Sequence, residues 1–218
     1  MKRQVRLEEI SDGRLYSAND MVKADCKDCR GCSACCHGMG DSIQLDPYDI
    51  WRLAQGLGKS FEQLLQEQAV CLSVSDGIIL PHLNLSGPGE ACRFLNEQGR
   101  CSIHPYRPGI CRMFPLGRYY TEDGFAYILQ THECRQENRS KIKIRKWLDT
   151  PQLPKYEQYI LDWHRMLVGI QSRIQTEGCD SAYAKTVNMQ LLQQFYLAPY
   201  GTEDFYSAFW ERMAQASF

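Results

Sequence analysis

Residues 26–40 read CKDCRGCSACCHGMG, and this stretch, called here the cysteine loop, is the most informative part of the chain. Cysteine occupies every third position from Cys26 to Cys35, and Cys36 follows at once. The pattern has neither the 3.6-residue period of a helix nor the two-residue period of a strand. Gly31 and Gly38 allow the backbone to approach closely. We therefore predict an irregular loop that turns several sulfurs toward one point.

The remaining cysteines extend this signal along the chain. There are 11 cysteines, and ten of them lie between Cys26 and Cys134. The N-terminal sequence lacks the apolar stretch of a secretory signal, and no apolar run approaches the ~18 residues of a membrane span. We expect a cytoplasmic protein, whose thiols stay reduced. A cysteine cluster in that compartment more often binds metal or does redox chemistry than forms disulfides, and the odd total disfavours full pairing.

Thiolates select zinc, copper(I) or iron–sulfur clusters over hard ions. The C-x2-C-x2-C spacing of Cys29, Cys32 and Cys35, completed by a distant fourth cysteine, is typical of iron–sulfur sites. Zinc is the main alternative, but it commonly uses two C-x2-C knuckles, and the later cysteines are not spaced in that way. The sequence favours an iron–sulfur cluster over zinc.

The number of sites stays open at this point. Eight thiolates could fill one cluster and one zinc site, two four-ligand sites, or one site with spare cysteines. Participation of Cys26 and of His37, which directly follows Cys36, is also open.

Arginines accompany the later cysteines. Residues 91–118 contain five arginines and a single acidic residue, Glu97. Buried thiolates with a metal carry net negative charge, and burying that charge is costly unless cations offset it. We expect Arg107 and Arg112 to lie around the cofactor and to offset this negative charge. The arginines could equally form a solvated or anion-binding surface.

Local signals define several elements outside the cysteine loop. A helix is predicted from Pro47, with Asp46 as its N-cap, and a second helix after Ser60. Hairpins are predicted to turn at Asp76-Gly77 and Asp123-Gly124. Residues 86–117 are rich in glycine and proline, so we expect irregular backbone there.

From Ser140 onward apolar residues recur three or four apart, which predicts helices that pack against one another. We therefore predict an α+β fold: an irregular cysteine-rich metal-binding domain at residues 1–139, followed by a C-terminal helical appendage at 140–218. With 218 residues, a net charge of −1 and 44% hydrophobic residues, the chain is neither disordered nor a generic nucleic-acid binder. We expect a protein partner, and neither nucleic acid nor a membrane.

Two segments together resemble a known family: the cysteine loop and residues 92–117, which read CRFLNEQGRCSIHPYRPGICRMFPLG. They are similar to the YkgJ-like CxxCxxCC cysteine-cluster family, a zinc- or iron-chelating domain that is also similar to one in flagellin lysine-N-methylases. The resemblance covers residues 26–134, about half of the chain. It implies metal chelation, and Cys26 is additional to its pattern. The ligand-type positions of the family correspond here to Cys29, Cys32, Cys35, Cys36, Cys92, Cys101, Cys111 and Cys134. Its RPxxCRxxP segment corresponds to Arg107, Pro108, Cys111, Arg112 and Pro115.

These observations predict a metal-binding protein, with a 4Fe–4S type cluster on cysteine thiolates and a redox, sensing or delivery role. One alternative is a structural zinc protein, in which the metal holds together a segment too rich in glycine and proline to fold alone. Another, by the family resemblance, is a methyltransferase-type enzyme, although no S-adenosylmethionine-binding fingerprint is visible.

Overall fold

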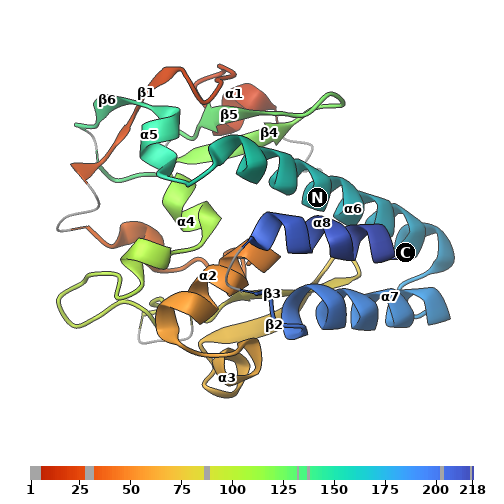
Figure 1. The fold of residues 1–218 in the computed structure, drawn as a ribbon. Coiled ribbons are helices and arrows are strands. Elements are labelled where there is room, and N and C mark those ends of the chain that lie inside the picture. Colours follow the sequence, from red (N-terminus) through yellow and green to blue (C-terminus); the bar gives the residue numbers. More distant parts are fainter. Residues whose placement is uncertain are drawn as a thin grey trace.

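The computed structural model describes residues 6–27, 32–85, 89–131, 133–136, 138–201, 204–216 and 218. Helices and small sheets alternate along the first two thirds of the chain, and helices fill the last third (Figure 1). The fold is α+β with a helical C-terminal region, as the sequence predicts.

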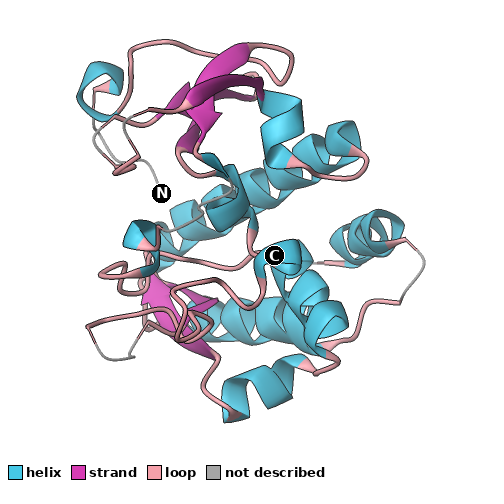
Figure 2. Ribbon diagram, turned by 90° about the vertical axis from the view of Figure 1, so that its left-hand side faces the viewer, coloured by secondary structure: helices cyan, strands magenta, loops and turns pink. Residues whose placement is uncertain are grey.

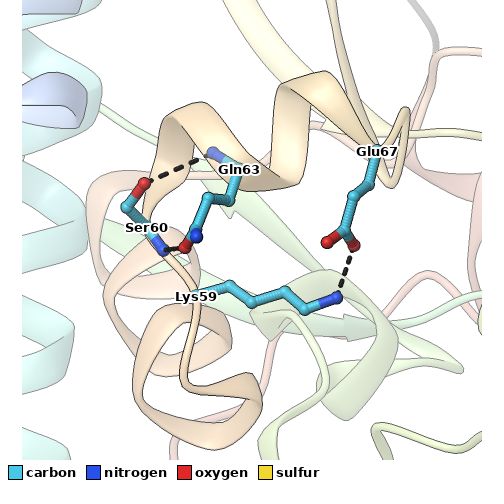
Figure 3. Close-up of polar contacts among 4 residues, drawn as sticks. All are labelled: Lys59, Ser60, Gln63 and Glu67. Carbon is cyan, nitrogen blue, oxygen red and sulfur yellow. Dashed lines mark hydrogen bonds and ion pairs between the residues drawn. The ribbon is translucent and has the colours of Figure 1, made fainter.

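Helix α2 (Pro47–Leu57) and helix α3 (Phe61–Gln66) begin at the predicted caps. The Asp46 side chain accepts a hydrogen bond from the backbone N–H of Asp49, and the Asp49 side chain accepts one from the N–H of Asp46. Ser60 and Gln63 make the same reciprocal pair at α3 (Figure 3). Each pair satisfies backbone donors that a helix start leaves without partners, so these two helices are specified locally.

The strands in the described part of the chain form three two-stranded antiparallel ribbons. Strand β2 (Val70–Ser75) pairs with β3 (Ile78–Leu83), and β4 (Leu116–Tyr120) pairs with β5 (Phe125–Leu129). The first ribbon turns at Asp76-Gly77, where both residues have positive φ, and this favours the turn type that matches strand twist. Both ribbons confirm the predicted hairpins.

The third ribbon joins β1 (Met21–Asp25) to β6 (Ser140–Lys143). The prediction of helical structure from Ser140 is wrong for the first four residues, because they pair with β1 and helix α5 (Ile144–Leu148) starts only afterwards. Val22 lies opposite Ile142 in this ribbon. Asp25 lies opposite Ser140, so the ribbon ends directly before Cys26.

The C-terminal region contains α6 (Leu153–Glu177), α7 (Ala182–Leu192), a π-helical turn at Gln193–Leu197 and α8 (Phe205–Gln215). The predicted apolar stripes of these helices meet in a cluster of aromatic rings. The ring of Tyr159 lies edge-on to Phe209, with centroids 4.6 Å apart, and Trp163 packs against Phe195 at 5.5 Å. Figure 1 shows α8 running beside α6, with α7 below them.

The helical region is attached to α2 by hydrogen bonds. The Tyr159 hydroxyl accepts a bond of 3.0 Å from the backbone N–H of Tyr48, and the Tyr196 hydroxyl donates one of 3.0 Å to the carbonyl of Leu45. Buried residues from both parts of the chain belong to one hydrophobic core. No helix among the described residues has the length and hydropathy needed to span a membrane.

The described residues also include four short helices: α1 (Leu7–Ile10), the 3₁₀ turns η2 (Ala34–Cys36) and η3 (His104–Tyr106), and α4 (Gly109–Met113). The last three lie among the cysteine-bearing segments. Figure 2 shows the strands in two separate places.

Candidate metal centre

Backbone hydrogen bonds join the end of the cysteine loop to the segment that carries Cys92. The N–H of Cys92 donates to the carbonyl of Cys36 at 2.7 Å, and the N–H of Gly38 donates to the carbonyl of Glu90 at 3.1 Å. His37 and Ala91 form an antiparallel bridge between these bonds. Cys36 and Cys92, which are far apart in the sequence, therefore become neighbours through the main chain.

A tight turn brings Cys101 back toward Cys92. The Asn96 side chain accepts hydrogen bonds from the N–H groups of Gln98 and Arg100, and Leu95 forms a bridge with Cys101. Gly99 has φ +69°, a conformation that glycine adopts easily. The glycine and asparagine of this segment thus fix a compact turn with a cysteine on each side.

Helix α4 carries Cys111 and is held from two directions. The N–H of Gly109 donates to Asp49 Oδ1 at 2.7 Å, which connects α4 to the start of α2. Trp147 Nε1 donates to the carbonyls of Met113 and Phe114 at 3.1 and 3.2 Å, which connects it to α5. This helix has no local sequence signal, because it spans only five residues in a segment rich in glycine and proline.

Four cysteines line one cavity: Cys26, Cys32, Cys35 and Cys134. Ala34, Phe114 and Arg135 are also on its wall. Cys26 lies just after β1, and its side chain is 5% exposed. The resemblance to the family left Cys26 outside the ligand set. Its three-residue spacing from Cys29 is the sequence signal that places it with the others.

The thiols influence one another. The pKa of Cys35 is lowered to about 7, chiefly because Cys36 hydrogen-bonds to it, and the charge of Arg107 also lowers it. The same hydrogen bond, burial and the charges of Cys35, Cys92 and Cys111 raise the pKa of Cys36. Burial is the main cause that raises the pKa of Cys92, Cys101 and Cys111. Burial and crowding therefore favour neutral thiols at Cys36, Cys92, Cys101 and Cys111, whereas Cys35 ionises more easily than an ordinary thiol. A bound cation would favour the ionised form of all of them.

The two arginines predicted to lie around the cofactor have different surroundings. Arg107 lowers the pKa of both Cys35 and Cys101, so its charge acts on thiols of the site. Arg112 is 5% exposed, and its guanidinium lies over the Tyr156 ring, 5.6 Å from the centroid. Its Nη1 donates to the carbonyl of Arg107, while its Nη2 is buried with no hydrogen-bond partner in the described part of the protein.

Of the eight predicted ligands, Cys29 lies outside the described residues. Cys32, Cys35 and Cys134 line the cavity, whereas Cys36, Cys92 and Cys101 lie on the hydrogen-bonded segments described above and Cys111 lies in α4. Across the described ranges, no three His, Cys, Asp or Glu side chains are arranged so that they could hold one metal ion. His37 is exposed, and its Nδ1 is 3.4 Å from the carbonyl oxygen of Gly89.

The donor set fits a soft metal in its chemistry. The cysteines gathered here are free thiols, and none of the described ones forms a disulfide. Soft sulfur donors of this kind, with Arg107 beside them, suit zinc or an iron–sulfur centre and do not suit calcium or magnesium. Cys179 is exposed, and Cys71 lies on β2, opposite His82 in the β2–β3 ribbon.

Comparison with known families agrees with this chemistry. The family model described as "CxxCxxCC: Putative zinc- or iron-chelating domain" matches residues 28–140, just over half of the chain. The chain belongs to this family. The matched segment contains each of the eight predicted ligands, whereas Cys26 lies just before it. Searches of curated proteins and of solved structures gave no match. The cysteine-rich half of the protein is thus a zinc- or iron-chelating domain.

Proposed function

We propose that this CxxCxxCC protein carries an iron–sulfur cluster of the 4Fe–4S type and serves in electron transfer, redox sensing or cluster delivery to a protein partner. The observation that carries the proposal is the cavity lined by Cys26, Cys32, Cys35 and Cys134. The wall of this small cavity carries four soft sulfur donors, which is the number of thiolates that such a cluster takes.

The chain's own residues would bind and tune the group. We assign the ligand role to Cys29, Cys32 and Cys35 of the cysteine loop together with Cys134. Cys26 is a further thiol on the same wall. Arg107 offsets thiolate charge near Cys35, which favours the ionised sulfur that a metal requires. Ala34 and Phe114 make part of the cavity wall apolar and limit the access of water. An iron–sulfur cluster supplies one-electron redox chemistry when it is bound.

The test is the metal content of protein purified and kept without oxygen. We expect a brown protein with broad visible absorption, and with iron and acid-labile sulfide in equal amounts. Cys134→Ser should lower the iron and sulfide content at the cavity. Cys179→Ser is the matched control, because Cys179 is exposed and outside the family segment, and it should retain full content.

A colourless, folded protein with stoichiometric zinc and no sulfide would contradict the proposal and favour the structural zinc alternative. In that case removal of zinc should unfold the cysteine-rich half without any change in visible absorption.

A further inference from the structure

Strand β2 is an edge strand with apolar side chains at the protein surface. Among the described strands it pairs only with β3, in a register without a bulge. The side chains of Leu72 and Val74 are 42% and 68% exposed. Edge strands present main-chain donors and acceptors that another strand can pair with, and proteins commonly protect them with charged residues, proline, a bulge or a covering segment. The sequence of β2, VCLSVS, contains neither a charged residue nor proline.

Other strand edges of the protein do carry such protection. The β1–β6 ribbon contains Lys23 and Lys143, and its register shifts between Val22 and Asp25. The outer edge of β5 is covered, because residues 16 and 127 exchange main-chain hydrogen bonds of 2.8 Å in both directions. Strand β2 therefore differs from these edges in leaving a short apolar strand open to pairing.

Hydrogen bonds on the far side of β3 show which way its main chain points. The Leu45 N–H donates to the carbonyl of Pro81 at 2.8 Å. The Ile79 N–H donates to Asn188 Oδ1, on helix α7, at 2.7 Å. Pro81 and Ile79 thus direct these main-chain groups away from β2, and the far edge of β3 is already occupied.

The main-chain groups of Leu72 and Val74 consequently point to the open edge. These two residues lie opposite Pro81 and Ile79 in the ribbon. Opposite residues in an antiparallel ladder alternate between hydrogen-bonded and non-hydrogen-bonded pairs, and both members of a non-hydrogen-bonded pair direct their N–H and C=O groups outward. Within the described ranges, no residue forms a hydrogen bond with these outward groups of Leu72 and Val74.

The open edge of β2 is complementary to a second copy of itself. When two β2 strands lie antiparallel with Ser73 on the two-fold axis, Leu72 of each copy faces Val74 of the other, and their outward N–H and C=O groups bond in both directions. Apolar side chains then meet apolar side chains, and no like charges meet because β2 is uncharged. The net charge of −1 also gives two copies little long-range repulsion.

We propose that the protein forms a two-fold symmetric dimer in which two β2 strands pair antiparallel about Ser73 and join their β2–β3 ribbons into one continuous sheet. The interface is isologous, since the same strand contributes from both copies. Strand β2 carries none of the predicted metal ligands, so the dimer does not depend on which metal the cysteine-rich half binds.

The test is the mass of the full, metal-loaded chain, measured by light scattering over a range of protein concentrations. We expect the mass of two chains for the wild-type protein and of one chain for Val74→Pro. Proline fits this position of the ribbon because the Val74 N–H is not bonded to β3, but it removes the outward donor and its ring obstructs a second strand.

Two further variants serve as controls and should remain dimeric. Val74→Thr keeps both the outward N–H and a β-branched side chain at the same position. Leu15→Lys changes another exposed apolar residue, 51% exposed, which does not belong to β2.

A second measurement uses the wild-type protein alone and does not depend on the folding of variants. Amide hydrogen exchange is followed residue by residue at low and high protein concentration. The Leu72 and Val74 amides should exchange more slowly as the dimer forms. The Ser73 amide, which already faces β3, should change little.

A mass of one chain at every concentration, or a dimer that persists in Val74→Pro, would overturn the proposal. Protection of the Leu72 and Val74 amides that appears only when a different protein is added would likewise overturn it, because the edge would then serve another partner.

Discussion

Gly109 is the residue at which helix α4, which carries Cys111, is joined to helix α2. A Cβ atom at this position would lie 2.4 Å from the Tyr156 hydroxyl oxygen, so any larger residue must push α4 away from α6. The Gly109 N–H also donates to Asp49, and a shift of α4 would lengthen that bond.

Gly109→Ala should therefore destabilise the metal-loaded protein by about 1–3 kcal/mol, the usual range for overpacking a filled core. Denaturant unfolding of the loaded protein measures the change. Gly169→Ala is the control, because Gly169 lies within α6 and its Cβ would meet no atom within 4 Å. That substitution should leave stability unchanged or raise it by up to about 1 kcal/mol. If the two substitutions changed the unfolding free energy equally, the close approach of Gly109 to Tyr156 would not contribute to the loss of stability.

Asp49 is a buried carboxyl group whose ionisation opposes folding. Burial and, next, the charge of Asp46 raise its pKa to about 8, against the opposing effects of the Arg112 charge and of the hydrogen bond from the Gly109 N–H. Since the folded pKa lies above the unfolded value near 4, the contribution of Asp49 to stability is fully present below about pH 4. It is lost as the pH rises through about 8.

Asp49→Asn should remove this pH dependence, because asparagine keeps an acceptor for the Gly109 N–H and does not ionise. Between pH 6 and 8 we expect the wild-type protein to lose about 1–2 kcal/mol more stability than the variant. The measured quantity is the difference in unfolding free energy between the two metal-loaded proteins, because pH effects that are common to both cancel in this difference. If the unfolding free energies of the two proteins changed with pH in parallel, ionisation of Asp49 would not be the cause of the pH dependence.

Single residues differ in how far the sequence reveals them. Asp46 could be identified as a helix cap, because its neighbours along the chain supply its partners. The burial of Asp49 and Arg112 could not be predicted, because charged side chains normally lie at the surface and their partners here come from distant elements. Cys26 is an intermediate case, because its spacing from Cys29 is visible in the sequence whereas its position in the cavity is not.

At the scale of elements, α3 tests how much stability a local cap contributes. The Ser60 side chain accepts from the Gln63 N–H at 3.3 Å, and the Gln63 side chain accepts from the Ser60 N–H at 2.8 Å (Figure 3). Lys59 and Glu67 form an ion pair of 2.5 Å on the same surface, with both side chains more than a third exposed.

Ser60→Ala should cost about 1 kcal/mol of unfolding free energy, because it leaves N-terminal N–H groups of α3 without their partner. Lys59→Ala is the matched comparison and should cost less than about 0.5 kcal/mol, since exposed ion pairs contribute little. Denaturant unfolding at two salt concentrations distinguishes them, because only the ion pair is screened by salt. A larger loss for Lys59→Ala than for Ser60→Ala would refute this ranking.

Elements with local signals were predictable, and elements formed by distant partners were not. Helices α2 and α3 and two of the ribbons carry their caps or turns in sequence. Strand β6 has no such signal, because it extends only against β1, more than a hundred residues earlier in the chain. The short helix α4 is likewise fixed by Asp49 and Trp147 rather than by its own residues.

At the scale of the whole molecule, the aromatic cluster of the C-terminal helices contains no cysteine. Phe195, Phe209 and Leu191 are fully buried there, and Tyr159 reaches from this cluster to the backbone of α2. Its stability comes from apolar burial and ring packing, neither of which needs a metal.

Removal of metal by a chelator should therefore affect the two parts differently. We expect hydrogen exchange to quicken in the described cysteine-bearing segments and to stay slow in α6, α7 and α8. The comparison uses the full chain with and without metal. A loss of protection in α6, α7 and α8 as large as that in α4 would show that the metal stabilises the whole protein instead.

The β1–β6 ribbon has a consequence for the rate at which metal is taken up. It joins Asp25 to Ser140, so every predicted ligand lies on one loop of about 115 residues whose ends are already tied. Bringing the ends of such a loop together from an open chain would cost about 4 kcal/mol of chain entropy, apart from a constant. Because the β1–β6 ribbon already holds the two ends together, this loss of chain entropy does not oppose metal binding. Metal uptake then requires only the rearrangement of short neighbouring segments. We expect its rate to depend on the metal concentration and not on the time that distant segments of the chain need to meet.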